Sequence, residues 1–296
     1  MKRIFFIGLT VLLFATYACD SGKQLAETRQ TAQTAYNTAD YAKALEQWDI
    51  LINKSKLKGS EKQCTAFTGA GMAANKLGQT EKAIDYLKQA TYGEFSNEDT
   101  YFTLAEIYSE KDNLSLELEN LEIYESKFPQ GKNIEDVNKR LFELYVEIEN
   151  WEKALSFWEK LNDTQKAITQ QIENYLIINN ALENDVKSKE LALQLLAEDE
   201  NNIVALDWLA NYYFWKAENR YNKEMKIYEQ KKTRKQYAHL LKVIDEVAVE
   251  FNQALKYAKK LYELDPQAVN AKLLGNTYSR LNYKDKAEYY QKLGEK

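Results

Sequence analysis

The sequence predicts an all-α protein, and three observations support this prediction. The 296 residues include only 2 Pro and 10 Gly, and no glycine occurs from Lys132 to Leu274. Sheet proteins need frequent turns, which these two residue types usually supply. Leu, Ala, Glu, Lys and Gln are abundant, and all five are good helix formers. With 45% hydrophobic residues, a chain of this length can also bury a sizeable core.

The N-terminus has the pattern of an export signal. Lys2 and Arg3 precede an apolar run over 4–14, which is shorter than the roughly 20 residues needed to span a bilayer. Ala18 and Cys19 follow, and this stretch resembles the lipobox of bacterial lipoproteins. The resemblance implies a signal peptide at 1–18, an acylated Cys19 and a short tether at 19–24. It favours a lipid-anchored protein of the bacterial cell envelope, at the outer membrane. Ordinary cleavage after Ala18, leaving a free thiol, is the alternative.

Three segments share one pattern: "TADYAKALEQWDIL", "LGQTEKAIDYLKQA" and "LNYKDKAEYYQKL". Each places a turn before an alanine, with a large residue four positions later. The pattern resembles the tetratricopeptide repeat, a pair of antiparallel helices of about 34 residues. The resemblance implies a right-handed superhelical solenoid of stacked antiparallel helix pairs, with about seven units over 25–296.

The small and large residues at the matching positions are predicted core positions, because small residues let two helices approach and large ones fill the space between units. Proline at its matching position ends the second helix, because it cannot donate a hydrogen bond to the preceding turn. The third unit has Glu117 where the second-helix alanine is expected, and a degenerate fifth unit covers about 167–202. In chain order the matches are Ala32, Ala44, Trp48 and Leu51; Phe67, Ala70, Gly71, Ala83 and Leu87; Leu104, Ala105, Tyr108 and Pro129; Leu141, Tyr145, Ala154 and Trp158; Leu209, Ala210, Tyr213, Ala254 and Pro266; Leu274, Gly275, Tyr278 and Ala287.

The sixth unit departs from the regular spacing. Ala210 and Ala254 are 44 residues apart, where a regular unit such as Gly71 to Ala83 needs 12, so about 32 residues are inserted, at 216–248. Apolar residues continue at spacings of three and four, which predicts two lengthened helices that form an antiparallel hairpin. The two apolar series are Leu206, Leu209, Tyr213, Ala217, Tyr221, Met225 and Tyr228, then Tyr237, Leu240, Leu241, Ile244, Val247, Phe251, Leu255, Ala258 and Leu261.

Two surfaces are candidates for binding a partner. In the tetratricopeptide family the first helices of the units line a concave groove, which implies that Asp99, Phe102, Glu106, Glu110, Asp136, Lys139, Glu143, Glu147, Asn211, Phe214 and Trp215 face a partner. The inserted hairpin carries a local excess of positive charge, and its candidate contacts are Lys223, Lys226, Lys231, Lys232, Arg234 and Lys235. A solvated, charged helix surface is the alternative for both.

Composition argues against several classes of function. A net charge of −5 disfavours a general nucleic-acid binder. Cys19, Cys64 and His239 are the whole inventory of cysteine and histidine, short of the four ligands of a structural zinc site. No glycine-rich phosphate loop occurs, and the single histidine lies in a helical pattern. We therefore expect no enzyme activity, no cofactor and no metal.

Two functions remain open. The first is a non-catalytic scaffold that binds a protein or peptide partner at the cell envelope. The second is a surface lipoprotein that binds a glycan or nutrient together with an outer-membrane transporter, for which Trp215 would be the main contact.

Overall fold

The computed structural model describes residues 7–93 and 96–295, with side chains from residue 22 onward. Every regular element in these residues is a helix and none is a strand, which confirms the predicted all-α class. The chain divides into two compact units, Met1–Leu144 and Tyr145–Lys296. A single solenoid over 25–296 stays a prediction.

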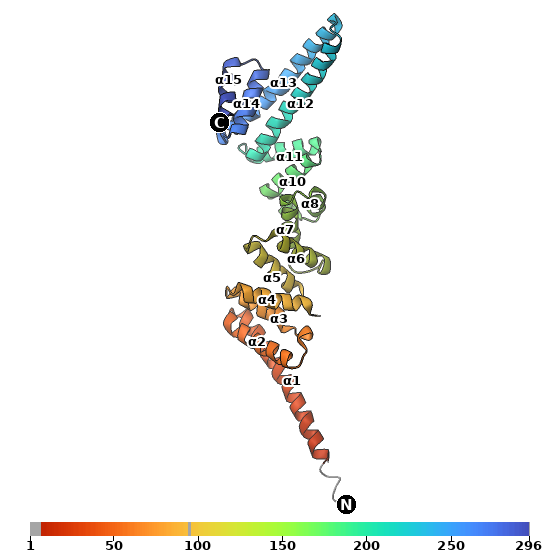
Figure 1. Ribbon diagram of the computed structural model, residues 1–296, viewed down its shortest axis with the longest axis vertical. Helices are drawn as coiled ribbons and strands as arrows, with labels where there is room; N and C mark the ends of the chain where they lie inside the picture. The colour runs from red at the N-terminus through yellow and green to blue at the C-terminus, as the bar shows by residue number, and fades with distance from the viewer. Residues whose placement is uncertain (1–6, 94–95, 296) are drawn as a thin grey trace, which may run out of the picture. The chain divides into compact units, whose positions relative to one another are not determined.

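The first unit is a stack of helix pairs. Within it α1 packs on α2, α3 on α4 and α5 on α6, while contacts of α2 with α3 and of α4 with α5 join successive pairs (Figure 1). A short 3₁₀ helix, η1 (Glu61–Gln63), separates the first two pairs, and the final helix α7 crosses the boundary between the units. The helices are α1 (Ile7–Asn37), α2 (Tyr41–Leu57), α3 (Ala66–Lys76), α4 (Thr80–Tyr92), α5 (Glu98–Glu110), α6 (Leu114–Lys127) and α7 (Ile134–Glu147).

The second unit repeats this arrangement. Here α10 packs on α11, α12 on α13 and α14 on α15, and the contacts of α11 with α12 and of α13 with α14 continue the stack. One hydrophobic cluster runs through these pairs, and a separate cluster fills the first three pairs of the first unit. The helices are α8 (Trp151–Trp158), α9 (Asp163–Lys166), α10 (Thr169–Ala181), α11 (Asp185–Glu198), α12 (Ile203–Gln230), α13 (Arg234–Leu264), α14 (Ala268–Arg280) and α15 (Lys284–Leu293).

The small residues of the repeat pattern lie where helices approach most closely. Ala44, Ala83 and Ala154 are completely buried. A Cβ atom added to Gly71 would lie 2.6 Å from Cγ of Leu87, so only glycine fits there without movement of α4. The predicted core positions are therefore confirmed for these units, and the reason is steric, as expected from close packing.

The turn inside a regular pair has one recurring geometry. In six pairs the second residue after the first helix has a positive φ, and the next backbone N–H donates to the carbonyl five residues earlier, as in a Schellman motif. Only one of these six residues is a glycine, so the sequence alone does not reveal the motif. The residues are Ala39, Gly78, Asp112, Glu149, Glu183 and Asn282.

The sixth pair forms the predicted lengthened hairpin. Helices α12 and α13 contain 28 and 31 residues and run side by side (Figure 1). The buried residues of α13 include Leu240, Val243, Val247 and Phe251, and the last three belong to the hydrophobic cluster of this unit. Part of the second predicted apolar series does not follow this line. Tyr237, Leu241 and Ile244 are 50%, 45% and 37% exposed, because they lie on a flank of α13 beside the buried line.

The N-terminal predictions fall largely outside the described residues. The structure does not describe residues 1–6, nor the side chains of 7–21, so signal cleavage and the acylation of Cys19 stay predictions. Among the described helices, none is both long enough and apolar enough to span a membrane.

Candidate partner-binding clefts

The first unit has a cleft of about 180 Å³ between α5, α6 and α7. We call it the acidic cleft. Phe102, Ala105, Leu121 and Val137 give it an apolar lining, and Glu106 and Asp136 line it as well. Three of the residues predicted to face a partner, Phe102, Glu106 and Asp136, are thus brought together. The complete lining is Phe102, Ala105, Glu106, Ser109, Glu117, Leu121, Asp136, Val137 and Arg140.

Glu117, the residue that replaces the expected alanine, lies in the wall of this cleft. Its side chain is 3% exposed and accepts two hydrogen bonds from Arg140 of α7. Nε of Arg140 lies 2.6 Å from Oε1 of Glu117, and its second nitrogen lies 3.0 Å from Oε2. This bidentate pair satisfies a carboxylate that would otherwise be buried without compensation. It also joins α6 to α7 at the cleft.

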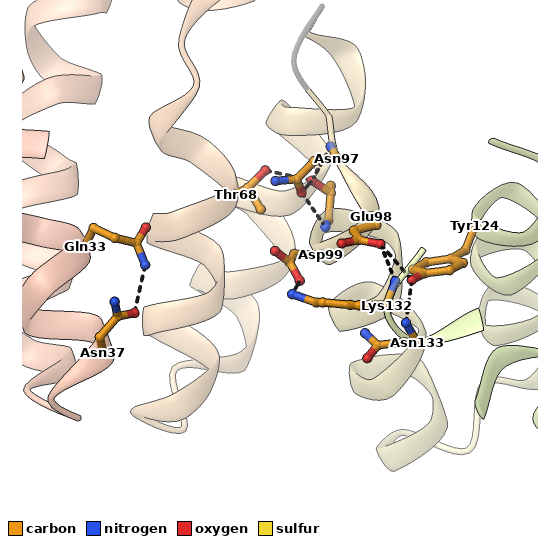
Figure 2. Close-up of polar contacts among 10 residues, drawn as sticks. Gln33, Asn37, Thr68, Asn97, Glu98, Asp99, Tyr124, Lys132 and Asn133 are labelled. Carbon is orange, nitrogen blue, oxygen red and sulfur yellow. Dashed lines mark hydrogen bonds and ion pairs between the residues drawn. The ribbon is translucent and has the colours of Figure 1, made fainter. Parts of the chain in front are cut away.

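A polar network fixes the loop that leads into α7. Figure 2 shows Glu98 accepting hydrogen bonds from the Tyr124 hydroxyl, at 3.0 Å, and from the backbone N–H of Lys132, at 2.9 Å. The Tyr124 hydroxyl in turn accepts from the backbone N–H of Asn133 at 3.0 Å. Nζ of Lys132 also pairs with Asp99 at 2.5 Å. The start of α7 is thereby held against α5 and α6, which sets the width of the cleft.

The predicted acidic residues differ in how far their charge is compensated. Asp99 pairs with Lys132, and Glu143 lies 3.8 Å from Lys139 and 3.6 Å from Arg140. Glu106, Glu110 and Asp136 form no ion pair with a basic side chain within the described part of the chain. Glu147 is exposed and follows the boundary between the units, so we do not assign it to the cleft.

The surroundings of Glu106 make ionisation of its carboxyl less favourable than it is in water. Partial burial raises the pKa of its carboxyl, the nearby Glu110 raises it further, and Lys76 of α3 acts in the opposite direction. A cation that entered the cleft would lower this pKa again and would favour the ionised form. A positively charged group of a partner would therefore bind favourably beside Glu106.

The second unit has a different cleft, of about 390 Å³, which we call the aromatic cleft. Residues at helical spacing on one face of α12 form most of it, together with the end of α10 and the start of α11. Of the predicted residues, Asn211 and Trp215 lie here. The lining is Asn180, Asp185, Trp208, Asn211, Tyr212, Trp215, Lys216 and Asn219.

Hydrogen bonds and stacking hold the aromatic cleft in shape. The rings of Trp208 and Tyr212 stack at 4.8 Å, and Nε1 of Trp208 donates to Asn180 at 2.8 Å. The amide of Asn211 donates to the carboxylate of Asp207 at 2.9 Å. Burial raises the pKa of Asp207, which the Asn211 bond opposes and the charge of Asp265 reinforces. Trp215 remains 55% exposed.

Phe214 does not belong to a partner surface, and that part of the sequence prediction is wrong. Its side chain is 5% exposed and packs against Phe251 of α13, with the ring centroids 5.8 Å apart. The neighbouring Trp215 points outward instead, because successive helix positions differ by about 100°.

The basic residues predicted at the hairpin lie at its distal end and are exposed. Lys223 and Lys226 are on the last turns of α12, Lys231 and Lys232 in the connecting turn, and Arg234 and Lys235 at the start of α13. His239 is also exposed, with Nε2 3.2 Å from Glu224. Among the described residues, no group of three or more His, Cys, Asp or Glu could hold a metal ion.

Sequence reasoning missed a larger hollow beside η1. This hollow, of about 790 Å³, is lined by Lys56, Glu61, Lys62, Phe67, Asp85, Tyr86, Gln89, Tyr92 and Gly93. The only signal in the sequence is the extra length of the connection before α3, which has no helical periodicity. Asp49 accepts a hydrogen bond from Tyr86 at 2.6 Å, and this bond fixes one wall.

No protein-family model matches the chain, and neither does any curated protein. Several solved structures are similar. A tetratricopeptide repeat protein from Parabacteroides merdae is 14% identical, with 92% of this chain and 93% of that chain covered and a TM-score of 0.45. A putative protein-binding protein from Bacteroides ovatus is 16% identical, with 64% and 99% covered and a TM-score of 0.49. The C-terminal part of a repeat-containing protein from Cytophaga hutchinsonii is 14% identical, with 90% and 93% covered and a TM-score of 0.48.

These similarities are too weak to carry any binding property over to this chain. The chain is a helix-pair repeat protein whose buried positions resemble those of the tetratricopeptide repeat. What it binds has to be inferred from its own clefts.

Proposed function

We propose that this chain is a non-catalytic interaction scaffold whose acidic cleft binds a basic, partly apolar segment of a partner protein. One observation carries the proposal: Glu106 and Asp136, which form no ion pair among the described residues, line this cleft together with apolar side chains, and Glu110 lies one helical turn from Glu106. Surfaces that bind proteins combine a desolvated apolar centre with charged groups around it.

The proposed segment matches this arrangement in size and charge. A cleft of about 180 Å³ accepts one or two apolar side chains. A lysine or arginine next to them would reach Glu106 or Asp136, and complementary charge would speed association and select against acidic segments. The Glu117–Arg140 pair and the Glu98 network keep the cleft open before binding, which reduces the entropic cost of association.

Site-specific photocrosslinking in the native cells tests this proposal. A benzoylphenylalanine placed at Ser109, in the cleft, should capture a protein that the same group at Leu57, which is 88% exposed on α2, does not capture. Glu106→Lys combined with Asp136→Lys should abolish the capture. The control is Glu46→Lys combined with Glu119→Lys, which changes the charge equally at exposed positions outside the cleft. Equal capture from Ser109 and Leu57 would refute the proposal.

The proposed location is the bacterial outer membrane, with Cys19 carrying the lipid. The basic start, the short apolar run and the small residue before Cys19 support this part of the proposal. Mass spectrometry of the mature N-terminal peptide would test it, since acylation adds the mass of its fatty acids to a peptide that begins at Cys19. An unmodified thiol there, or an uncleaved N-terminus, would refute it.

A second candidate function is the binding of a glycan in the aromatic cleft. The exposed Trp215 favours it, because a flat aromatic face beside amide groups suits the apolar face and the hydroxyl groups of a sugar ring. Titration with neutral oligosaccharides should then change the tryptophan fluorescence in a saturable way, and Trp215→Ala should remove the change. Trp151→Phe, outside this cleft, is the matched control. No saturable change with any neutral oligosaccharide would exclude this function.

A further inference from the structure

The ion pairs of the α12–α13 hairpin are unevenly distributed. Near its base, Lys216 pairs with Glu250 at 2.9 Å, Arg220 pairs with Glu246, and Arg280 of α14 pairs with Glu218. At the distal end His239 lies 3.2 Å from Glu224, but the exposed lysine and arginine residues form no ion pair within the described residues. They are Lys223, Lys226, Lys231, Lys232, Arg234 and Lys235. The positive charge of the hairpin is thus compensated at the base and uncompensated at its end.

An apolar stripe lies beside these charges. Arg234, Tyr237, Leu241 and Ile244 follow one another at spacings of three, four and three, so they share one face of α13. This face is separate from the line of Leu240, Val243, Val247 and Phe251 that packs into the core. The Tyr237 ring lies 5.8 Å from the Tyr228 ring across the hairpin. Otherwise the stripe faces solvent, and Tyr237 is 50% exposed.

This combination selects among anionic partners. A nucleic-acid surface would use the basic residues but would gain little from exposed Leu and Ile side chains. The interface of a bilayer uses both, because tyrosine rings and aliphatic side chains enter the head-group level while lysine and arginine reach the lipid phosphates. Basic clusters near a membrane bind anionic lipids in this way.

We propose that the distal end of the α12–α13 hairpin binds the surface of a bilayer containing anionic phospholipids. Tyr237, Leu241 and Ile244 lie at the level of the head groups, and the six uncompensated basic residues contact phosphates. This contact is independent of the acyl group predicted at Cys19 and of the acidic cleft.

The test places a fluorescent reporter in the stripe of the full chain, mixed with lipid vesicles. Tyr237→Trp is compared with Tyr289→Trp, a control that places tryptophan at an exposed position on α15. The spectrum of the unsubstituted chain is subtracted, which leaves the emission of the introduced tryptophan alone. This emission depends on the local environment of that tryptophan, whichever part of the chain attaches the protein to the vesicle. Vesicles contain brominated acyl chains, with either phosphatidylcholine alone or about one third phosphatidylglycerol.

With the anionic vesicles, the Tyr237→Trp emission should shift to shorter wavelength and be quenched, while the Tyr289→Trp emission should not change. The response should disappear at about 0.5 M salt, where charges are screened within a few Å. Reversal of Lys231, Lys232 and Lys235 to Glu should weaken the response at least a hundredfold, because each basic residue near the surface contributes about fivefold. The control replaces three lysines that are exposed elsewhere in the same unit, Lys259, Lys272 and Lys284, by Glu, and this variant should keep the response to anionic vesicles.

Three results would overturn the proposal. They are a Tyr237→Trp emission unaffected by anionic vesicles, an equal response to phosphatidylcholine alone, and a response that survives the reversal at the hairpin end. Circular dichroism of each variant would establish that the helices are intact. If benzoylphenylalanine at Ser109 captured no partner but the chain still bound the vesicles, the proposed scaffold function would be refuted and this inference would stand.

Discussion

Glu117 and Arg140 form a bidentate ion pair in which the glutamate side chain is buried and the arginine side chain is 35% exposed. The two partners are therefore not equivalent. Removing the arginine leaves a charge inside the protein, whereas removing the glutamate leaves a charge that can turn toward water. This asymmetry gives the first prediction.

Arg140→Met should destabilise the first unit by about 3 kcal/mol or more, because the buried Glu117 loses its partner. Glu117→Ala restores the usual alanine of the repeat and should cost about 1 kcal/mol or less. The double variant should be close to Glu117→Ala alone. Denaturant unfolding, with hydrogen exchange of α6 and α7 to locate the effect, measures this cycle. Equal costs for the two single variants would contradict the asymmetry.

Gly71→Ala should destabilise the pair of α3 and α4, whose helices meet at this position. The new methyl group would clash with Leu87, and overpacking of this kind costs about 1–3 kcal/mol, partly offset by about 1 kcal/mol of helix propensity. In a Leu87→Ala background the same change should be neutral or stabilising. Thermal unfolding of the four variants gives the coupling between the two sites, and a coupling near zero would argue against the clash.

Ala39→Gly should stabilise the first unit. Ala39 has a φ of 60°, a left-handed conformation that costs a residue with a Cβ roughly 1–2 kcal/mol, while glycine loses about 0.4–1 kcal/mol more chain entropy on folding. The expected net gain is about 0.5–1 kcal/mol. Gly78→Ala, at the equivalent turn with a φ of 71°, is the reciprocal test and should destabilise by a similar amount. Changes of the same sign for both would disprove this account of the turn.

Glu106→Gln should make the first unit slightly more stable at neutral pH and weaken its binding of basic segments. The folded state raises the pKa of Glu106 through burial, so the folded state binds the proton more tightly than the unfolded state does. Stability then falls as pH rises from the ordinary glutamate pKa to the raised one, and the cost persists above it. The stability difference between variant and wild type should vanish at acidic pH, where both side chains are neutral. Unfolding at both pH values, with Glu119→Gln as control, measures it.

Much of the fold could be predicted because the signal is local and periodic. Spacings of three and four residues identify helices, and a recurring alanine with a large residue four positions later identifies the pairs. The lengthened hairpin also followed from counting, since Ala210 and Ala254 are 44 residues apart. Helices α12 and α13 confirm it.

The sites were less predictable, because they depend on which flank of a helix is covered. Phe214 and Trp215 are adjacent in sequence, yet one is core and the other lies in the aromatic cleft. Tyr237, Leu241 and Ile244 fit a helical spacing as well as the buried residues beside them do, but they are exposed. The apolar periodicity predicts one apolar face of a helix. The position of the neighbouring helix decides which side of that face is buried and which side is exposed to solvent.

The paired helices, and the small residues that let them approach, could be predicted from the sequence, because both properties depend on neighbours within one or two turns. Only the tertiary structure shows that Glu117 meets Arg140, and that Glu106, Asp136 and the lysine and arginine residues at the end of the hairpin form no ion pair among the described residues. Those facts join residues from different helices, and a spacing along one helix does not contain them.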